Sequence, residues 1–142
     1  MDGNLRHLEH SVEVGVAVTF AWKFLTDISN WHDPPARFTL EGPFVAGTTG
    51  TTSLPGQEPM RWRLVEVQAG ERYTTELQLD RAVLQFEWRF EALSERRTRL
   101  TQRILLTGAN AAAYAPQLAA GFGANLAAGM QRIADAMEKR QR

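Results

Sequence analysis

Apolar and polar residues alternate through the middle of the chain, as they do in strands of a sheet with one buried and one wet face. The clearest case is segment 83–92, where every second residue from Leu84 to Phe90 is large and apolar and the residues between them are polar or charged. Similar patterns, bounded by glycine or proline, predict further strands at 8–16, 38–41, 51–54, 60–67, 71–79 and 99–107. The sequence therefore predicts an antiparallel sheet of six to seven strands.

Helical spacing replaces this alternation in two places. Between positions 18 and 28 the apolar residues recur every three or four positions, and Pro34-Pro35 then ends any continuing helix. The same spacing from Leu118 to Met137 predicts one long helix at 116–140, about 37 Å in length. Pro116 suits the first turn of a helix, which favours a start there rather than at Asn110.

Composition narrows the class of protein. The 142 residues are enough for one domain, residues 1–142, that buries roughly 70% of the surface its unfolded chain exposes. Sixteen basic and sixteen acidic residues cancel, so the net charge indicates neither a nucleic acid nor an anionic membrane as partner. Cysteine is absent, which excludes disulfides and is typical of a reducing compartment. Without an apolar signal peptide or a membrane-length apolar stretch, we expect a cytoplasmic protein with no integral membrane contact.

Four features carry a resemblance to a known superfamily. They are the pattern Trp-x-x-Leu-x-Asp-x-x-x-Trp at 22–31, the turn with Gly42-Pro43-Phe44 at 40–48, the segment Arg61-Trp62-Arg63-Leu64-Val65-Glu66-Val67, and a long C-terminal helix ending in Met137-Glu138. In the order and spacing of these features, from about Leu8 to Glu138, the chain resembles the START-like helix-grip superfamily (SRPBCC). The resemblance is to its bacterial polyketide cyclase/dehydrase branch.

This resemblance implies an α+β helix-grip fold. In that fold a curved antiparallel sheet wraps around the long C-terminal helix, and two short helices, around Val18 and near Trp31, follow the first strand. The superfamily includes lipid carriers, hormone-binding proteins, aromatase/cyclases and chaperone activators. Membership therefore implies an apolar pocket more firmly than it names a ligand.

The apolar faces of the strands and of the last helix define the lining of such a pocket. They combine many large aromatic residues with a few polar groups, which is the composition of small-molecule sites. The alternative interpretation of the same residues is a filled hydrophobic core. The expected cavity residues are Trp31, Trp62, Leu64, Tyr73, Thr75, Leu77, Phe86, Trp88, Phe90, Gln102, Ile104, Phe122, Asn125, Leu126 and Met130.

Few residues offer chemistry beyond packing. Gln102 and Asn125 each need a backbone, water or ligand partner, because a buried amide without one costs about 1–3 kcal/mol. His32 beside Asp33 is the nearest approach to an acid–base site, and an exposed loop histidine is its alternative. No serine lies in a nucleophile motif, and no glycine-rich phosphate loop occurs. No metal, cofactor or firm catalytic residue is therefore expected.

Three functions are compatible with this sequence. The first is binding of an apolar or aromatic ligand, lipid-like or polyketide-like, between sheet and helix without chemical change. The second is an aromatase/cyclase or dehydrase in which His32, Tyr73, Gln102 or Asn125 transfers a proton or orients a carbonyl. The third is a protein-interaction module like the chaperone activators. We expect the first, and the sequence leaves the oligomeric state open between monomer and homodimer.

Overall fold

The computed structural model describes residues 6–31 and 33–141. Its strands are β1 (Arg6–Val14), β2 (Arg37–Leu40), β3 (Thr49–Ser53), β4 (Met60–Gln68), β5 (Arg72–Leu79), β6 (Ala82–Ser94) and β7 (Arg97–Thr107). Its helical elements are α1 (Val18–Leu25), the 3-10 turn η1 (Ile28–Asn30), α2 (Ala111–Leu118), the π turn η2 (Ala119–Gly123) and α3 (Leu126–Gln141). Two short helical elements thus follow the first strand, as expected.

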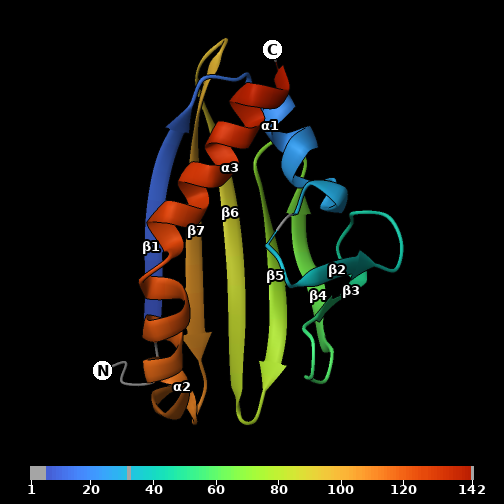
Figure 1. Cartoon of the computed structure of the whole chain (residues 1–142), viewed down its shortest axis with the longest axis vertical. Coiled ribbons are helices and arrows are strands. Elements are labelled where there is room, and N and C mark those ends of the chain that lie inside the picture. Colours follow the sequence, from blue (N-terminus) through green and yellow to red (C-terminus); the bar gives the residue numbers. More distant parts are fainter. Residues whose placement is uncertain (1–5, 32, 142) are drawn as a thin grey trace.

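The strands form one antiparallel sheet in the order β1-β7-β6-β5-β4-β3-β2 (Figure 1). Strands β2 to β7 follow one another as neighbours, and β1 pairs with β7. The pairing shifts register between Leu64 and Glu66 in β4 and between Ala92 and Ser94 in β6. Such bulges bend the strands that carry them. The antiparallel sheet predicted from the alternation, and the curvature that the resemblance implies, are confirmed.

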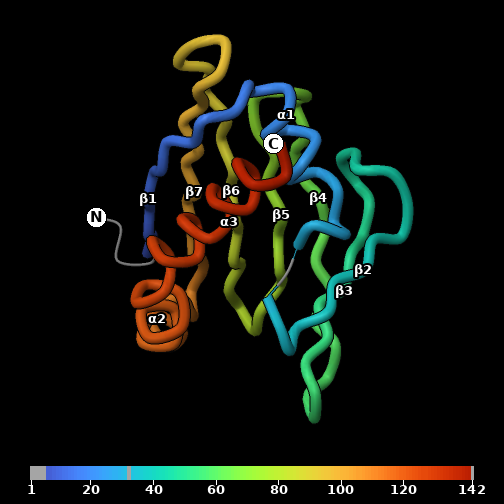
Figure 2. The backbone as a smooth tube through the Cα atoms, turned by 45° about the horizontal axis from the view of Figure 1, so that its top comes forward, coloured from blue at the N-terminus to red at the C-terminus, as the bar shows by residue number. Residues whose placement is uncertain are grey.

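Helix α3 lies across the inner face of this sheet, over β1 and β7 (Figures 1 and 2). Met130, Ala134 and Met137 form its buried side, each at most 1% exposed. They pack in one hydrophobic cluster with inner-face residues such as Phe90 and Leu100. The long C-terminal helix thus packs its apolar side against the sheet, and the helix-grip architecture is confirmed.

The start of the C-terminal helical region differs from the expectation. Helix α2 begins at Ala111, directly after Asn110, and Pro116 lies inside it rather than at its start. The side chain of Asn110 donates to the carbonyl oxygen of Asp80 in the β5–β6 turn, at 3.1 Å. Gly108, at φ +115°, lies so close to that turn that a Cβ would come within 2.8 Å of backbone atoms. These long-range contacts place the helix start, and periodicity does not register them.

The prediction of one continuous helix at 116–140 is also wrong. Pro116 has no N–H to donate, and the helix widens shortly after it into η2. The N–H of Ala119 donates to the carbonyl oxygens of both Ala115 and Pro116, and α3 begins only at Leu126. The region therefore consists of two α-helices joined through a π turn.

Candidate ligand site on the inner face of the sheet

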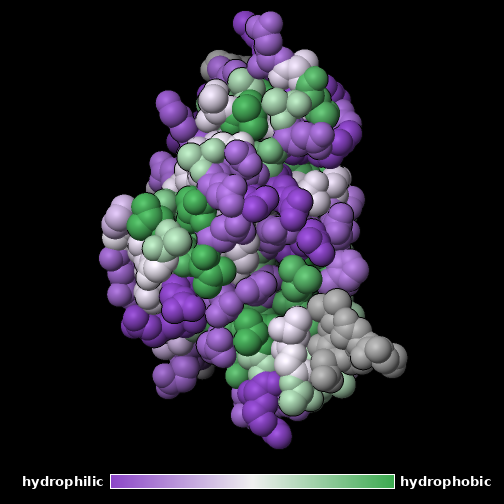
Figure 3. Space-filling model, turned by 180° about the vertical axis from the view of Figure 1, so that it is seen from behind, coloured by the Kyte–Doolittle hydropathy of each residue, from purple (hydrophilic) through white to green (hydrophobic). Residues whose placement is uncertain are grey.

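The two faces of the sheet differ in charge. On the outer face acidic and basic side chains pair across strands, and Arg103 reaches both Glu9 and Glu87, at 3.2 and 3.4 Å. Figure 3 shows that face as mainly hydrophilic, with apolar side chains scattered among the charges. Alternation places the strands' aliphatic and aromatic residues on the inner face. Among the described strands, Arg6 at the end of β1 is the one Lys or Arg residue on that face.

Cross-strand pairing arranges the inner-face side chains in transverse rows. In one row Tyr73 pairs with Trp88, Trp88 with Gln102, and Gln102 with His10. We call these four residues the polar row, because each side chain carries nitrogen or oxygen. Since neighbouring strands lie about 4.8 Å apart, the polar row spans four strands at that spacing. The next row is apolar except for Thr75, and it consists of Leu64, Thr75, Phe86, Ile104 and Leu8.

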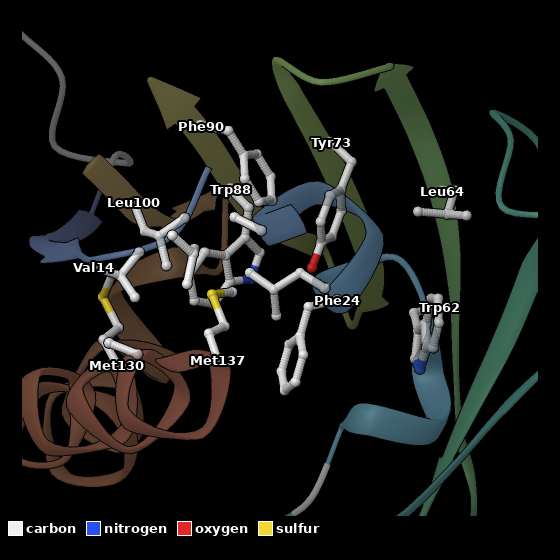
Figure 4. Close-up of a cluster of buried hydrophobic side chains, with 14 residues drawn as sticks. Val14, Phe24, Trp62, Leu64, Tyr73, Trp88, Phe90, Leu100, Met130 and Met137 are labelled. Atoms are coloured by element: carbon white, nitrogen blue, oxygen red, sulfur yellow. The ribbon is translucent and has the colours of Figure 1, made fainter. Parts of the chain in front are cut away.

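Tyr73 is the most enclosed member of the polar row. Its side chain is 2% exposed, and its ring contacts the rings of Trp22, Phe44 and Phe90 at centroid distances of 6.1, 4.9 and 6.2 Å. Figure 4 shows its hydroxyl pointing away from β5 into the cluster. That hydroxyl has no hydrogen bond with any residue that the structure describes. Burial raises the pKa of Tyr73 above its ordinary value, so the group is a neutral donor at physiological pH.

The Tyr73 hydroxyl is nevertheless within reach of solvent. Within 6–31 and 33–141, Nε of Arg103 is the one fully enclosed polar side-chain atom that lacks a hydrogen bond, and it lies on the outer face. Any other side-chain polar atom that lacks a hydrogen bond is therefore not fully enclosed, and it borders space that water can enter. The hydroxyl of Tyr73 is such an atom, and so are the side-chain polar atoms of Trp88 and Gln102.

Part of the inner face is left uncovered beside the polar row. Leu77, Phe86 and Gln102 all lie on this face and remain partly exposed, whereas Leu64 and Ile104 on the same face are 0% exposed. We call Leu77, Phe86 and Gln102 the open patch. An uncovered apolar surface inside a curved sheet is unusual, because the hydrophobic effect favours its removal from water.

The open patch lies where the two hydrophobic clusters of the protein meet. Leu77 and Leu126 are the residues that border both clusters. From the helical side, Phe122 of η2 packs edge-on against Phe86, with ring centroids 5.3 Å apart, and is itself 39% exposed. The π turn therefore presents a half-covered aromatic ring to the open patch.

Trp31 and Trp62 form a different kind of wall, near β2 to β4. Nε1 of Trp31 donates to the carbonyl oxygen of Leu25 at 2.9 Å, and Nε1 of Trp62 donates to Oγ1 of Thr52 at 3.0 Å. Their rings lie 5.6 Å apart. A Cβ on Gly50 would overlap the ring of Trp62, so only glycine allows this approach. Since both indole N–H groups already have acceptors, these tryptophans supply apolar surface and no free donor.

The sequence profile of the family described as "Polyketide cyclase / dehydrase and lipid transport" matches residues 6–138. The chain belongs to this family. The matched region includes the whole polar row and the whole open patch. Among proteins with curated descriptions, none matches the sequence significantly.

Solved structures of similar fold include two aromatase/cyclases and a norcoclaurine synthase. The ZhuI aromatase/cyclase from a Streptomyces species is 18% identical over 97% of this chain and 96% of its own, with a TM-score of 0.78. The di-domain aromatase/cyclase StfQ of the steffimycin biosynthetic pathway is 18% identical over 97% of this chain and 52% of its own, with a TM-score of 0.73. Norcoclaurine synthase from Thalictrum flavum is 11% identical over 97% of each chain, with a TM-score of 0.71. At these identities the likeness shows a shared fold.

Most of the residues expected to line a cavity in this polyketide cyclase/dehydrase-family chain lie on the inner face of the sheet. Those on the strands are Trp62, Leu64, Tyr73, Thr75, Leu77, Phe86, Trp88, Phe90, Gln102 and Ile104. Leu126 and Met130 of α3 pack against them. Asn125 is exposed instead, and its amide donates to the carbonyl oxygen of Gly121 at 3.2 Å. His32 lies outside the described residues.

Three residues near the candidate site were not found by sequence reasoning. His10 follows the alternation of Leu8 onto the inner face, but only its pairing with Gln102 joins it to the polar row. Trp22 and Phe44 contact Tyr73 from α1 and from the β2–β3 loop. The alternation within β1 is the signal that could have placed His10. No local signal exists for the other two, because their contacts come from tertiary packing.

Two surface depressions of this protein lie away from the inner-face site, near the C-terminal end of α3. One, of about 740 Å³, is lined by residues that include Gly15, Glu95 and Glu138. The other, of about 270 Å³, is lined by residues that include Phe24 and Arg140. Neither contains a residue of the polar row or of the open patch.

No three His, Asp or Glu side chains in the described part of the chain are grouped as a metal site. The helices in residues 6–31 and 33–141 are each too short or too polar to cross a bilayer.

Proposed function

We propose that this chain binds a small, mostly apolar molecule against the inner face of its sheet, over the open patch. The observation that carries the proposal is the partial exposure of Leu77, Phe86 and Gln102 beside Leu64 and Ile104, which are 0% exposed on the same face. A ligand placed there would remove apolar surface from water, at about 25 cal/mol for each Å² covered. The family's description, which names lipid transport and polyketide cyclisation, supports a ligand of this kind.

The polar row gives the proposed site its specificity. Small-molecule sites combine apolar walls with a few placed polar groups. Here the open patch supplies apolar surface, and the polar row beside it supplies the polar groups. Gln102 belongs to both sets, so a ligand over the open patch would also reach the row. A flat or elongated molecule fits this arrangement, because the row extends across four strands.

The test compares two leucine variants with the fluorescent probe 1-aminoanthracene. Leu77 lies on the inner face and Leu105 on the outer face, and both are partly exposed. We expect Leu77→Ala to weaken binding of the probe about 3- to 10-fold, because apolar contact with the ligand is lost. Leu105→Ala should bind as the wild type does. Equal affinities in both variants, or a wild type that does not bind the probe, would overturn the proposal.

A catalytic version of the same site is the second candidate. The observation that favours it is the presence of two proton-bearing side chains, Tyr73 and His10, at opposite ends of the polar row. The fold shared with ZhuI and StfQ, which are aromatase/cyclases, supports it as well. In such a reaction the row would orient carbonyl groups while one side chain donated a proton.

The catalytic version predicts that the bound ligand changes its mass, which binding alone does not. Mass spectrometry of a carbonyl-rich ligand recovered after incubation with the protein would show loss of one water if the chain catalyses dehydration. His10→Ala would then retain binding and lose that mass change. Recovery of the unchanged ligand from wild-type protein at every time point would leave binding alone as the function.

A further inference from the structure

We infer that Tyr73 anchors the ligand by a hydrogen bond, and that the ligand is a neutral aromatic molecule bearing an oxygen acceptor, such as an aryl ketone. The inference rests on the proposed function and adds to it the anchoring residue and the ligand class. Three properties of the polar row lead to it: an unpaired donor, a second donor beside it, and the absence of nearby charge.

The first step is the unpaired hydroxyl of Tyr73. A buried hydroxyl without a partner costs a folded protein about 1–3 kcal/mol. Its neighbours are the rings of Trp22, Phe44 and Phe90, none of which accepts a conventional hydrogen bond. The rings also hold the phenol in place, so it cannot turn to a distant acceptor. A partner for this hydroxyl must therefore come from outside the chain, either as water, which the space beside it admits, or as a ligand that replaces the water.

The second step is the neighbouring indole. Trp88 pairs directly with Tyr73 across β5 and β6, is 7% exposed, and has no hydrogen bond from Nε1 within the described part of the chain. Directly paired side chains have Cβ atoms about 4.5–5.5 Å apart. Figure 4 shows the Trp88 nitrogen and the Tyr73 oxygen both directed toward the middle of the cluster. One ligand oxygen, with two lone pairs, can accept from both donors.

The third step concerns charge. The indole N–H only donates, and the phenol is held protonated by burial, so the ligand atom between them is an acceptor. An anionic acceptor would also need a counter-charge, because burying an unpaired charge is expensive. Arg6, the one Lys or Arg residue on the inner face of the described strands, pairs with Leu106. His10 lies at the far end of the polar row, about 14 Å from Tyr73 at three strand spacings. The acceptor is therefore a neutral oxygen.

The fourth step concerns shape. The surroundings of the two donors are aromatic, since Phe90 and Trp22 contact each other edge-on at 5.1 Å and both contact Tyr73. Aromatic rings favour edge-to-face and offset contacts with other rings. A flat ring that carries its oxygen toward the donors would lie over the open patch, where Phe86 and Phe122 present further ring surface.

The test uses three competitors of similar shape that displace 1-aminoanthracene: 2-acetonaphthone, 2-ethylnaphthalene and 2-naphthoate. We expect the wild type to bind the ketone about tenfold more tightly than the hydrocarbon, as one to two net hydrogen bonds would give. The anion should bind more weakly than the ketone. Tyr73→Phe should lose most of the preference for the ketone while it binds 2-ethylnaphthalene as the wild type does.

The matched control is Tyr114→Phe, which removes the other phenol of the chain. The hydroxyl of Tyr114 accepts a hydrogen bond from the N–H of Asp80 at 3.2 Å, away from the polar row. Tyr114→Phe should keep the full preference for the ketone. Thermal unfolding of each variant shows that it is folded before binding is compared.

The outcomes separate the two proposals. If the wild type binds none of the three competitors nor the probe, the proposed function fails. If it binds them but Tyr73→Phe keeps the preference for the ketone, the anchor is wrong and the binding function stands. A preference of the wild type for 2-naphthoate would overturn the neutral ligand class.

Discussion

Two groups of aromatic residues on the same face of the sheet differ in how their polar atoms are treated. Near β2 to β4, the indoles of Trp31 and Trp62 donate to Leu25 and Thr52. In the centre, Tyr73 and Trp88 are 2% and 7% exposed, and neither side chain has a hydrogen bond in the described part of the chain. In the first group both indole N–H groups have acceptors within the protein, so we call it the complete group. The second group has no partners for its polar atoms among the described residues, as the proposed ligand site requires.

This difference has an energetic meaning. Buried polar atoms in folded proteins are nearly always paired, so an unpaired one marks either strain or function. Sites that bind ligands commonly lower the stability of the empty protein, and substitutions that remove their polar atoms then stabilise the fold. The two groups should therefore respond to removal of a polar atom with opposite signs.

The largest change in stability is expected when a side chain of the hydrogen-bonded tryptophan pair, Trp31 and Trp62, is removed. Trp62→Ala should lower the free energy of unfolding by about 4 kcal/mol, because it leaves a cavity against Trp31 and Gly50. Urea unfolding monitored by circular dichroism measures the change. Met60→Ala on the same strand is the control, since Met60 is 37% exposed. A loss in Trp62→Ala no greater than in the control would mean that this wall is not a structural unit.

Removing only the acceptor of the complete group should also destabilise the protein. Thr52→Val leaves Nε1 of Trp62 without its acceptor at nearly unchanged volume, and we expect a loss of about 2 kcal/mol. The same urea titration detects it. Unchanged stability would show that water replaces the hydroxyl at that position.

The central group predicts a dependence on alkaline pH. The pKa of Tyr73 is raised in the folded state above 10.0, so above pH 10 the unfolded chain releases a proton that the folded chain keeps. Stability is thus fully present below pH 10 and falls above it, by about 1.4 kcal/mol per pH unit. Unfolding of wild type and Tyr73→Phe at pH 9 and pH 11 measures the difference. Parallel behaviour of the two proteins would contradict the burial of an ionisable phenol.

The smallest effect has the opposite sign. Tyr73→Phe removes an unpaired hydroxyl from an aromatic environment and should raise the free energy of unfolding at neutral pH by about 1 kcal/mol. A calorimetric melting scan measures it. A loss of stability would mean that the hydroxyl has a partner inside the folded protein, and the contrast with Thr52 would disappear.

The sequence predicted the parts of the fold that follow from local pattern. Alternation located the strands, because inward and outward residues differ in chemistry at every second position. Local pattern did not predict in the same way which side chains of the C-terminal helical region face the sheet. The π turn after Pro116 changes the number of residues per turn, so Asn125, which regular spacing places beside Leu126 on the lining, is exposed instead.

The candidate site was predictable only as a set of residues. Alternation placed Tyr73, Trp88 and Gln102 on one face, but it could not say which polar atoms would be paired. Pairing depends on where distant segments come to lie: Thr52 arrives beside Trp62, whereas only aromatic rings arrive beside Tyr73. Such differences arise from tertiary packing and have no local signature.

The π turn has one more consequence, for how this fold changes through evolution. A π turn holds one residue more than the α-helical turn it replaces, and each residue of an α-helix accounts for about 100° of rotation. Deleting Gly123, which lies between Phe122 and α3, would turn Phe122 relative to α3 by about that angle, and Phe122 would leave Phe86. A change of one residue in chain length, without any substitution in the sheet, would therefore reshape the proposed ligand site in a descendant of this protein.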